Sequence, residues 1–187
     1  MTTKHYETGD VKLVKAVLSN SSKTINTGIM GQLISLSIYE DIEQPSIYCE
    51  LTMLDSINLI QDFPVIGEES LDISFYTPGR DKPTKMTFNI YSVDGQSAAS
   101  TTKGSIYTLK GVHPLHFYNA SATVSKSYKT VISDIVTDII TDMSDKSGIV
   151  LRANIETTKG LFPITIPRLA PFAAVDMVRQ RAVSAEN

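Results

Sequence analysis

The chain has 187 residues, of which 42% are hydrophobic and 20% are charged. A chain of this length buries roughly 70% of the surface of its extended form, so we expect a substantial core, and the composition excludes a wholly disordered or fibrous protein. The 17 Lys and Arg residues against 20 Asp and Glu give a net charge of -3, which offers no electrostatic reason to bind a phosphate backbone.

The single cysteine and the absence of long apolar runs predict a compartment. Cys49 has no partner for an internal disulfide, so the chain suits a reducing environment, and we expect a buried small apolar side chain rather than a nucleophile. Residues 1–10 hold no apolar run, which predicts no signal peptide. No window approaches the ~20 consecutive apolar residues of a spanning helix, so we expect a soluble protein of the cytoplasm.

The first 112 residues contain runs in which apolar and polar side chains alternate, as in half-buried strands. These runs are 11–18, 34–38, 47–53, 71–76, 85–93 and 105–112. Turns containing Pro45 and Pro83 predict hairpins between 34–38 and 47–53 and between 71–76 and 85–93. A hairpin from 11–18 to 34–38 is also expected. Asp55 as an N-cap and Pro64 as a stop predict one short helix between them. Six short strands with one helix predict an antiparallel β-barrel or a sandwich.

The pattern changes after Pro114. From Ser127, apolar residues recur at i, i+3 and i+4, which predicts an amphipathic helix that Gly148 closes. Short strands are expected at 149–152 and 161–166, and Pro171 at a favoured first position predicts a second helix over 172–184. The apolar residues of that helix have little sequence left to pack against, so it should rest on the preceding helix, on another chain or on residues beyond the sequence.

The expected fold class is therefore α+β, with an antiparallel β-barrel followed by an α/β segment that carries two amphipathic helices. We expect a first domain over 1–114 and, over 115–187, the start of a second domain that is incomplete.

Two sets of polar residues are candidates for chemical sites. Asp134, Asp138 and Asp142 share one helical ridge that does not converge on a point, so a solvated face is expected rather than a metal site. His113 and His116 lack further ligands at zinc spacing. The sequence holds no Gly-x-Ser-x-Gly elbow and no glycine-rich phosphate loop. We therefore predict no catalytic, cofactor-binding or metal-binding residues, and no enzyme.

Three segments carry a resemblance to a known family. They are IYEDI at 38–42, ELTMLDSINLI at 50–60 and PVIGEESLDISFYTPG at 64–79, and the terminal PFAAVDMVRQRAVS also fits. In order and spacing they resemble the first domain of the central hub protein in the baseplates of contractile-tailed bacteriophages and related contractile injection systems. These residues specify a fold and carry no chemistry.

The resemblance implies a structural component of the virion, assembled in the host cytoplasm. It implies a homotrimer on the tail axis, in which two similar tube domains per chain make a pseudo-six-fold ring that adapts the tail tube to the central spike. The implied partners are the tail tube protein, the central spike protein and other baseplate proteins, with DNA only as passing cargo and no direct membrane insertion. Candidate residues for ring contacts or for a DNA-repelling lumen are Glu40, Asp41, Glu43, Glu68 and Glu69.

Two other classes of function remain open on the sequence. One is a monomeric β-barrel that binds a small ligand or a peptide, with the polar segment 95–104 as a loop at its mouth. The other is a hydrolase without a recognisable motif, which would depend on residues such as Asp134 or His116.

Overall fold

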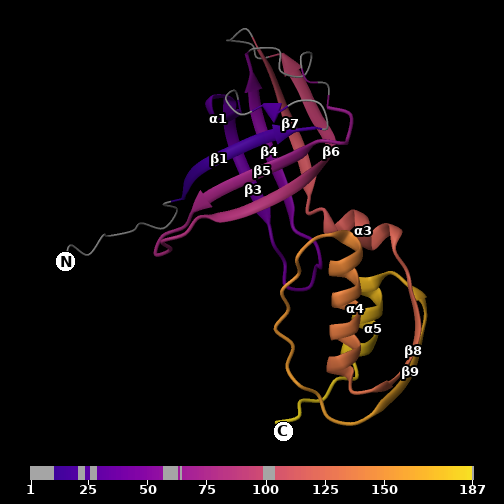
Figure 1. Cartoon of the computed structure of the whole chain (residues 1–187). Coiled ribbons are helices and arrows are strands. Elements are labelled where there is room, and N and C mark those ends of the chain that lie inside the picture. The colour runs from indigo at the N-terminus through magenta and orange to yellow at the C-terminus, as the bar shows by residue number, and fades with distance from the viewer. Residues whose placement is uncertain are drawn as a thin grey trace, which may run out of the picture. The chain divides into compact units, whose positions relative to one another are not determined.

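The computed structural model describes residues 11–20, 24–25, 29–56, 63, 65–98 and 104–186, and the chain divides into two compact units, Met1–Pro114 and Leu115–Asn187. Unit 1 contains one antiparallel sheet with the strand order β2-β1-β5-β6-β7-β4-β3 (Figure 1). Its strands are β1 (Lys12–Ser19), β2 (Thr24–Ile25), β3 (Leu33–Tyr39), β4 (Tyr48–Asp55), β5 (Ser70–Tyr76), β6 (Thr84–Ala98) and β7 (Ser105–Val112), and a short helix, α1 (Ile29–Gln32), precedes β3.

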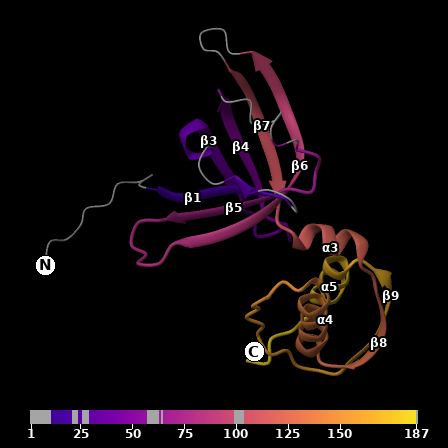
Figure 2. The same cartoon turned by 45° about the horizontal axis from the view of Figure 1, so that its top comes forward.

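The long strand β6 joins the two halves of this sheet. Residues 84–89 pair with β5, whereas residues 89–98 pair with β7. The register of β6 against β7 shifts between Ile90 and Ser92 and again between Asp94 and Ser97. Such irregularities bend and twist a strand. As a result β1 and β5 run across the line of β4 and β7, as Figures 1 and 2 show.

The sheet forms a curled half-barrel and does not close. At one end, β3 pairs only with β4, and at the other, β1 pairs with β5 and, through its last two residues, with β2. No described residues of β3 and β1 pair with each other. The α+β class agrees with the prediction, whereas the expected closed barrel is wrong, because the two end strands are left as edges.

The core of unit 1 lies between the two halves of the curled sheet. In β4 every second residue is buried, with Cys49, Leu51 and Met53 at 1% exposure or less. The other half contributes Leu71 and Phe88, both fully buried. Burial raises the pKa of the Cys49 thiol to about 12, so it stays neutral at physiological pH. The prediction that Cys49 is a buried apolar side chain is confirmed.

The predicted strand pairs of unit 1 have different outcomes. The hairpins β3–β4 and β5–β6 are confirmed. The hairpin from the first strand to β3 is wrong, because β1 pairs with β5. In the run 34–38, the alternation predicted a buried face that includes Ile34, and this is wrong: a register shift between Leu33 and Ser35 leaves the Ile34 side chain 55% exposed. The helix expected between Asp55 and Pro64 lies largely outside the described residues.

Unit 2 packs helices against a two-stranded sheet. Its elements are α3 (Leu115–Ser121), β8 (Val124–Thr130), α4 (Ile132–Ser147), β9 (Phe162–Leu169) and α5 (Pro171–Arg179). The core comes from one face of α4, represented by Ile135 and Ile139, and from Ala174 and Val178 of α5. The helices α4 and α5 lie side by side in Figure 1. Of the three supports considered for the last helix, the chain provides the preceding helix. None of the described helices is long and apolar enough to cross a bilayer.

Several boundaries in unit 2 differ from the prediction. Residues 127–130 belong to β8, and the helix starts at Ile132, because Val131 is extended with ψ 153°. The stop at Gly148 is confirmed: its φ is 70°, and its N–H donates to the Ser144 carbonyl at 3.0 Å. The strand expected at 149–152 is not formed, and the last helix ends at Arg179 rather than at 184. Neither α3 nor β8 was predicted from the sequence.

Candidate assembly surfaces

The two end strands of the half-barrel carry unpaired edges. On β1, residues 12–17 have no described strand on their outer side, because β2 reaches only Leu18 and Ser19. On β3, the side away from β4 has no described strand along its whole length. A free edge presents unpaired backbone N–H and C=O groups and is a template for another strand. These edges are the surfaces of unit 1 best suited to binding another polypeptide.

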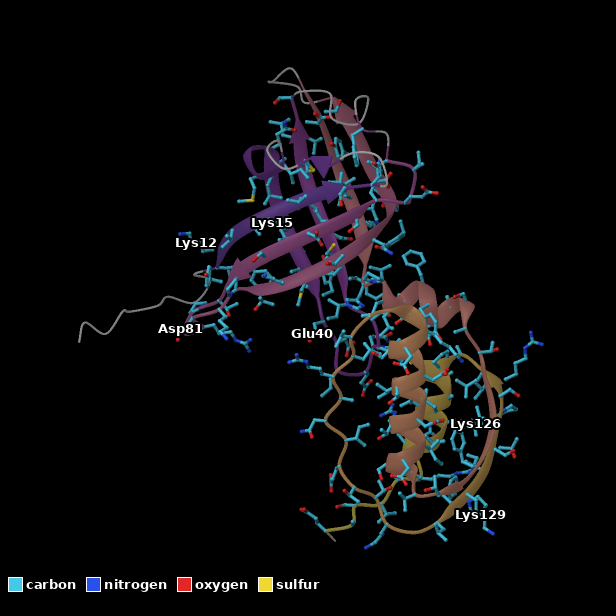
Figure 3. All side chains as sticks on the ribbon, viewed as in Figure 1. Lys12, Lys15, Glu40, Asp81, Lys126 and Lys129 are labelled. Carbon is cyan, nitrogen blue, oxygen red and sulfur yellow. The ribbon has the colours of Figure 1, made fainter. Side chains whose placement is uncertain are left out.

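Each free edge contains a bulge that exposes an apolar side chain. In β1 the register shifts between Leu13 and Lys15, and Val14 is 48% exposed. In β3 the corresponding shift exposes Ile34. Lys12 and Lys15 are exposed on β1, as Figure 3 shows. Neither lysine was predicted as an interface residue; the signal in the sequence was two lysines within a β-rich run.

The acidic turn between β3 and β4 is held by its own side chain. Asp41 accepts a hydrogen bond through Oδ1 from the backbone N–H of Glu43 at 2.9 Å, and its carbonyl accepts one from the N–H of Gln44 at 3.2 Å. This local pattern fixes an Asx-type turn. Glu40 and Glu43 are exposed on it, and Ile42 between them is fully exposed. The turn therefore presents carboxylates in a fixed arrangement directly after the free edge of β3.

Glu68 and Glu69 are neighbours in the sequence but differ in environment. Glu68 is exposed, whereas Glu69 is fully buried. The Glu69 carboxylate accepts hydrogen bonds from the N–H groups of Ile66 and Gly67, both at 2.9 Å. Glu69 therefore fixes the loop before β5 and, in this structure, is not part of an exposed acidic surface.

The register places the two acidic segments on opposite sides of one row of residues, because β5 extends from this row along residues 84–89 of β6, whereas β7 extends from it along residues 89–98. One row of Cα partners crosses five strands through Tyr39, Tyr48, Val112, Asn89 and Ser70. Glu40 directly follows the first residue of this row, and Glu69 directly precedes the last. Among the five candidates, Glu40, Asp41 and Glu43 share one turn, and Glu68 and Glu69 lie on a separate loop across the sheet.

The carboxylates of the α4 ridge are each engaged separately. Asp134 accepts from the Thr130 hydroxyl at 2.8 Å, and Asp142 pairs with Lys146 at 2.8 Å. Asp138 accepts from the Lys126 ammonium at 2.7 Å and from the Tyr128 hydroxyl at 2.6 Å, an arrangement that lowers its pKa. In the part of the chain that the structure describes, no three His, Cys, Asp or Glu side chains come together as a metal site.

Asp138→Asn is expected to lower the free energy of unfolding at pH 7 by less than about 1 kcal/mol, because the ion pair is half exposed. The pKa of Asp138 is lowered in the folded state. Its contribution is therefore present above the unfolded pKa of about 4 and is lost as the pH falls through the folded value. Urea unfolding at neutral and acid pH should show the difference from wild type shrinking at acid pH. The exposed Asp145→Asn on the same helix is the control, and a difference that persists in acid would contradict the assignment.

Of the two histidines considered as ligands, His113 precedes α3 and His116 lies in its first turn. His113 is partly buried, and burial lowers its pKa. The ring of His116 meets that of its neighbour Phe117 edge to face, with centroids 6.0 Å apart. Neither histidine belongs to a cluster of metal-binding side chains among the described residues.

One hollow among the described residues of unit 1 is small for a ligand site. A cavity of about 240 Å³ lies between residues 65–67 and residues 90–93 of β6. This volume is below the roughly 300–1,000 Å³ that ligand pockets usually offer. The segment 95–104, expected as a loop at a barrel mouth, is in part strand: residues 95–98 belong to β6, and 99–103 lie outside the described residues.

Comparison with known proteins identifies a solved structure with a similar fold. No protein-family model and no curated protein matches the chain. Among solved structures, the chain is similar to the tail protein from Neisseria meningitidis MC58, with a TM-score of 0.54 and 14% sequence identity. The match covers 89% of this chain and 44% of that protein, so the chain spans less than half of its length. At this identity the likeness shows a shared fold.

Proposed function

We propose that the chain is a structural, non-enzymatic subunit of a phage-type tail, and within it a component of the baseplate central hub. The observation that carries this proposal is the fold, which is similar across both units to that of a protein described as a tail protein. Unit 1 adds a physical reason, because its sheet ends in two free edges that another chain can cover. The protein then resides in the virion, at the tail.

In the full form of the proposal, three copies form a ring on the tail axis that adapts the six-fold tube to the three-fold spike. The tail tube protein, the central spike protein and other baseplate proteins are its partners, and DNA passes through the ring as cargo. Pseudo-six-fold symmetry requires two tube domains in each subunit. Unit 2, as described, holds a two-stranded sheet and is not a second copy of unit 1, so three-fold symmetry is the feature to test first.

Light scattering and negative-stain images of the purified chain, alone and mixed with the tube and spike proteins of the same tail, test the proposal. We expect a mass of three subunits and three-fold rings, or rings that cap the ends of tubes. A monomer that keeps its mass at every concentration and binds neither partner would contradict the hub assignment. Asp134→Ala and His116→Ala should leave assembly unchanged, since neither residue lies on a free edge of the sheet.

A further inference from the structure

The two free edges of the half-barrel differ in charge, because β1 itself contains two lysines and carboxylates directly follow β3. The unpaired part of β1 presents Lys12 and Lys15, whereas β3 runs directly into the turn that presents Glu40 and Glu43. Figure 3 labels the two lysines on β1 and Glu40 on the turn after β3. No exposed lysine or arginine lies on β3, and no carboxylate lies on β1. An edge of one copy is therefore complementary in charge to the opposite edge of another.

Strand direction supports the same pairing. Each neighbouring pair in the order β1-β5-β6-β7-β4-β3 is antiparallel, so β1 and β3 at the two ends point in opposite directions along the curled sheet. In a ring with rotational symmetry every copy turns the same sheet face to the axis. Continuing the sheet from one copy to the next then places β3 antiparallel to the following β1, which keeps the antiparallel pattern of the whole sheet.

We infer that β3 of one copy and residues 12–17 of β1 of a second copy form a head-to-tail seam. In this antiparallel pair the start of β1 lies opposite the end of β3. The lysines of one copy thus face the acidic turn of the other, and opposite charges that face each other across strands stabilise the pair. Val14 and Ile34, exposed at the bulges, supply apolar surface that the seam covers. The closure of such seams into a ring rests on the proposed function, whereas the pairing rests on the edges themselves.

Lysines and bulges on an edge strand also serve to prevent pairing with other chains. Under that alternative, the lysines of β1 prevent association by themselves, and the charge of the turn after β3 has no effect on self-assembly. The seam, in contrast, makes the two charge sets dependent on each other. Reversing the charges of the lysines and of the glutamates together therefore distinguishes a seam from an edge that prevents pairing.

The test measures the dissociation constant of self-assembly by light scattering in four forms of the full chain at low salt. Lys12→Glu with Lys15→Glu, and separately Glu40→Lys with Glu43→Lys, should each raise it about tenfold or more. The combination of all four changes should restore assembly to near the wild-type level. Glu40 and Glu43 are chosen because the side chain that hydrogen-bonds within the turn is that of Asp41. Added salt should weaken the wild-type seam.

The control is Asp145→Lys with Glu186→Lys, which changes the net charge as the second variant does but at exposed residues of unit 2, which contains neither edge strand. It should assemble as wild type does. Rings that form equally well in all variants would overturn the seam and leave the hub proposal standing. A wild-type chain that stays monomeric at every concentration would overturn both. Loss of assembly in both double variants without rescue in the combination would also overturn the seam.

Discussion

Gly111→Val is expected to lower the free energy of unfolding by about 3 kcal/mol or more, because β7 has no room for a side chain at this position. Gly111 lies opposite Cys49 on β4 and Ile90 on β6, in the row where the two halves of the sheet meet. A Cβ atom there would lie 2.8 Å from the Cys49 sulfur and 3.0 Å from Cβ of Phe88. Both neighbours are buried, so relief requires a shift of the strands themselves.

Chemical denaturation of matched variants measures this effect. Gly31→Ala, in α1, is the control: no atom lies within 4 Å of its added Cβ, so its change should stay within about 0.5 kcal/mol. Gly111→Ala should cost less than the valine. When it is combined with Cys49→Ala, the total should be smaller than the sum of the two single costs, because the smaller side chain removes the closer clash. Equal stabilities of Gly111→Val and wild type would show that the strands separate without cost.

Glu69→Ala is expected to lower the free energy of unfolding by about 2 kcal/mol. The fully buried carboxylate accepts from two backbone N–H groups, and alanine leaves both donors without this acceptor. The loop depends on this contact, because Gly67 adopts a φ of 97°, a left-handed conformation that glycine tolerates best. Thermal or urea unfolding measures the loss.

The neighbouring residue provides the control for this prediction. Glu68 is exposed, so Glu68→Ala should change the free energy of unfolding by less than about 0.5 kcal/mol. Glu69→Gln should fall between the two, because one amide oxygen replaces the two carboxylate oxygens that now accept. If Glu69→Ala and Glu68→Ala have the same stability, the buried carboxylate does not hold the loop.

Local patterns in the sequence were sufficient for the strands and helices whose burial follows a regular period. In β4 the buried residues alternate as expected, and β7 has the predicted bounds. In α4 the apolar stripe and the glycine stop are both present. These elements are visible in the sequence because each has one apolar face, and the spacing of that face is set by the backbone. In contrast, β8 has mostly exposed polar residues and is ordered by pairing with β9, which lies more than 30 residues further along the chain.

The candidate site was predictable only in part. The acidic turn after β3 is visible in the sequence, because Asp41 and the adjacent Pro45 are strong local turn signals. The different burial of Glu68 and Glu69 could not be predicted, because two adjacent glutamates give no sign of which side chain points into the core. Likewise, Lys12 and Lys15 became candidates only once β1 was known to be an end strand, a consequence of its pairing with β5.

Local patterns are enough to predict an α+β chain whose β-rich part precedes its helical part, with one buried thiol and an acidic turn, because burial period and turn chemistry act over a few residues. The open sheet, the position of its bend, the identity of its edge strands and the exposure of each carboxylate emerge only from the folded chain. These properties depend on contacts between segments far apart in the chain, whose free energy comes from joint burial and is not written in any one segment.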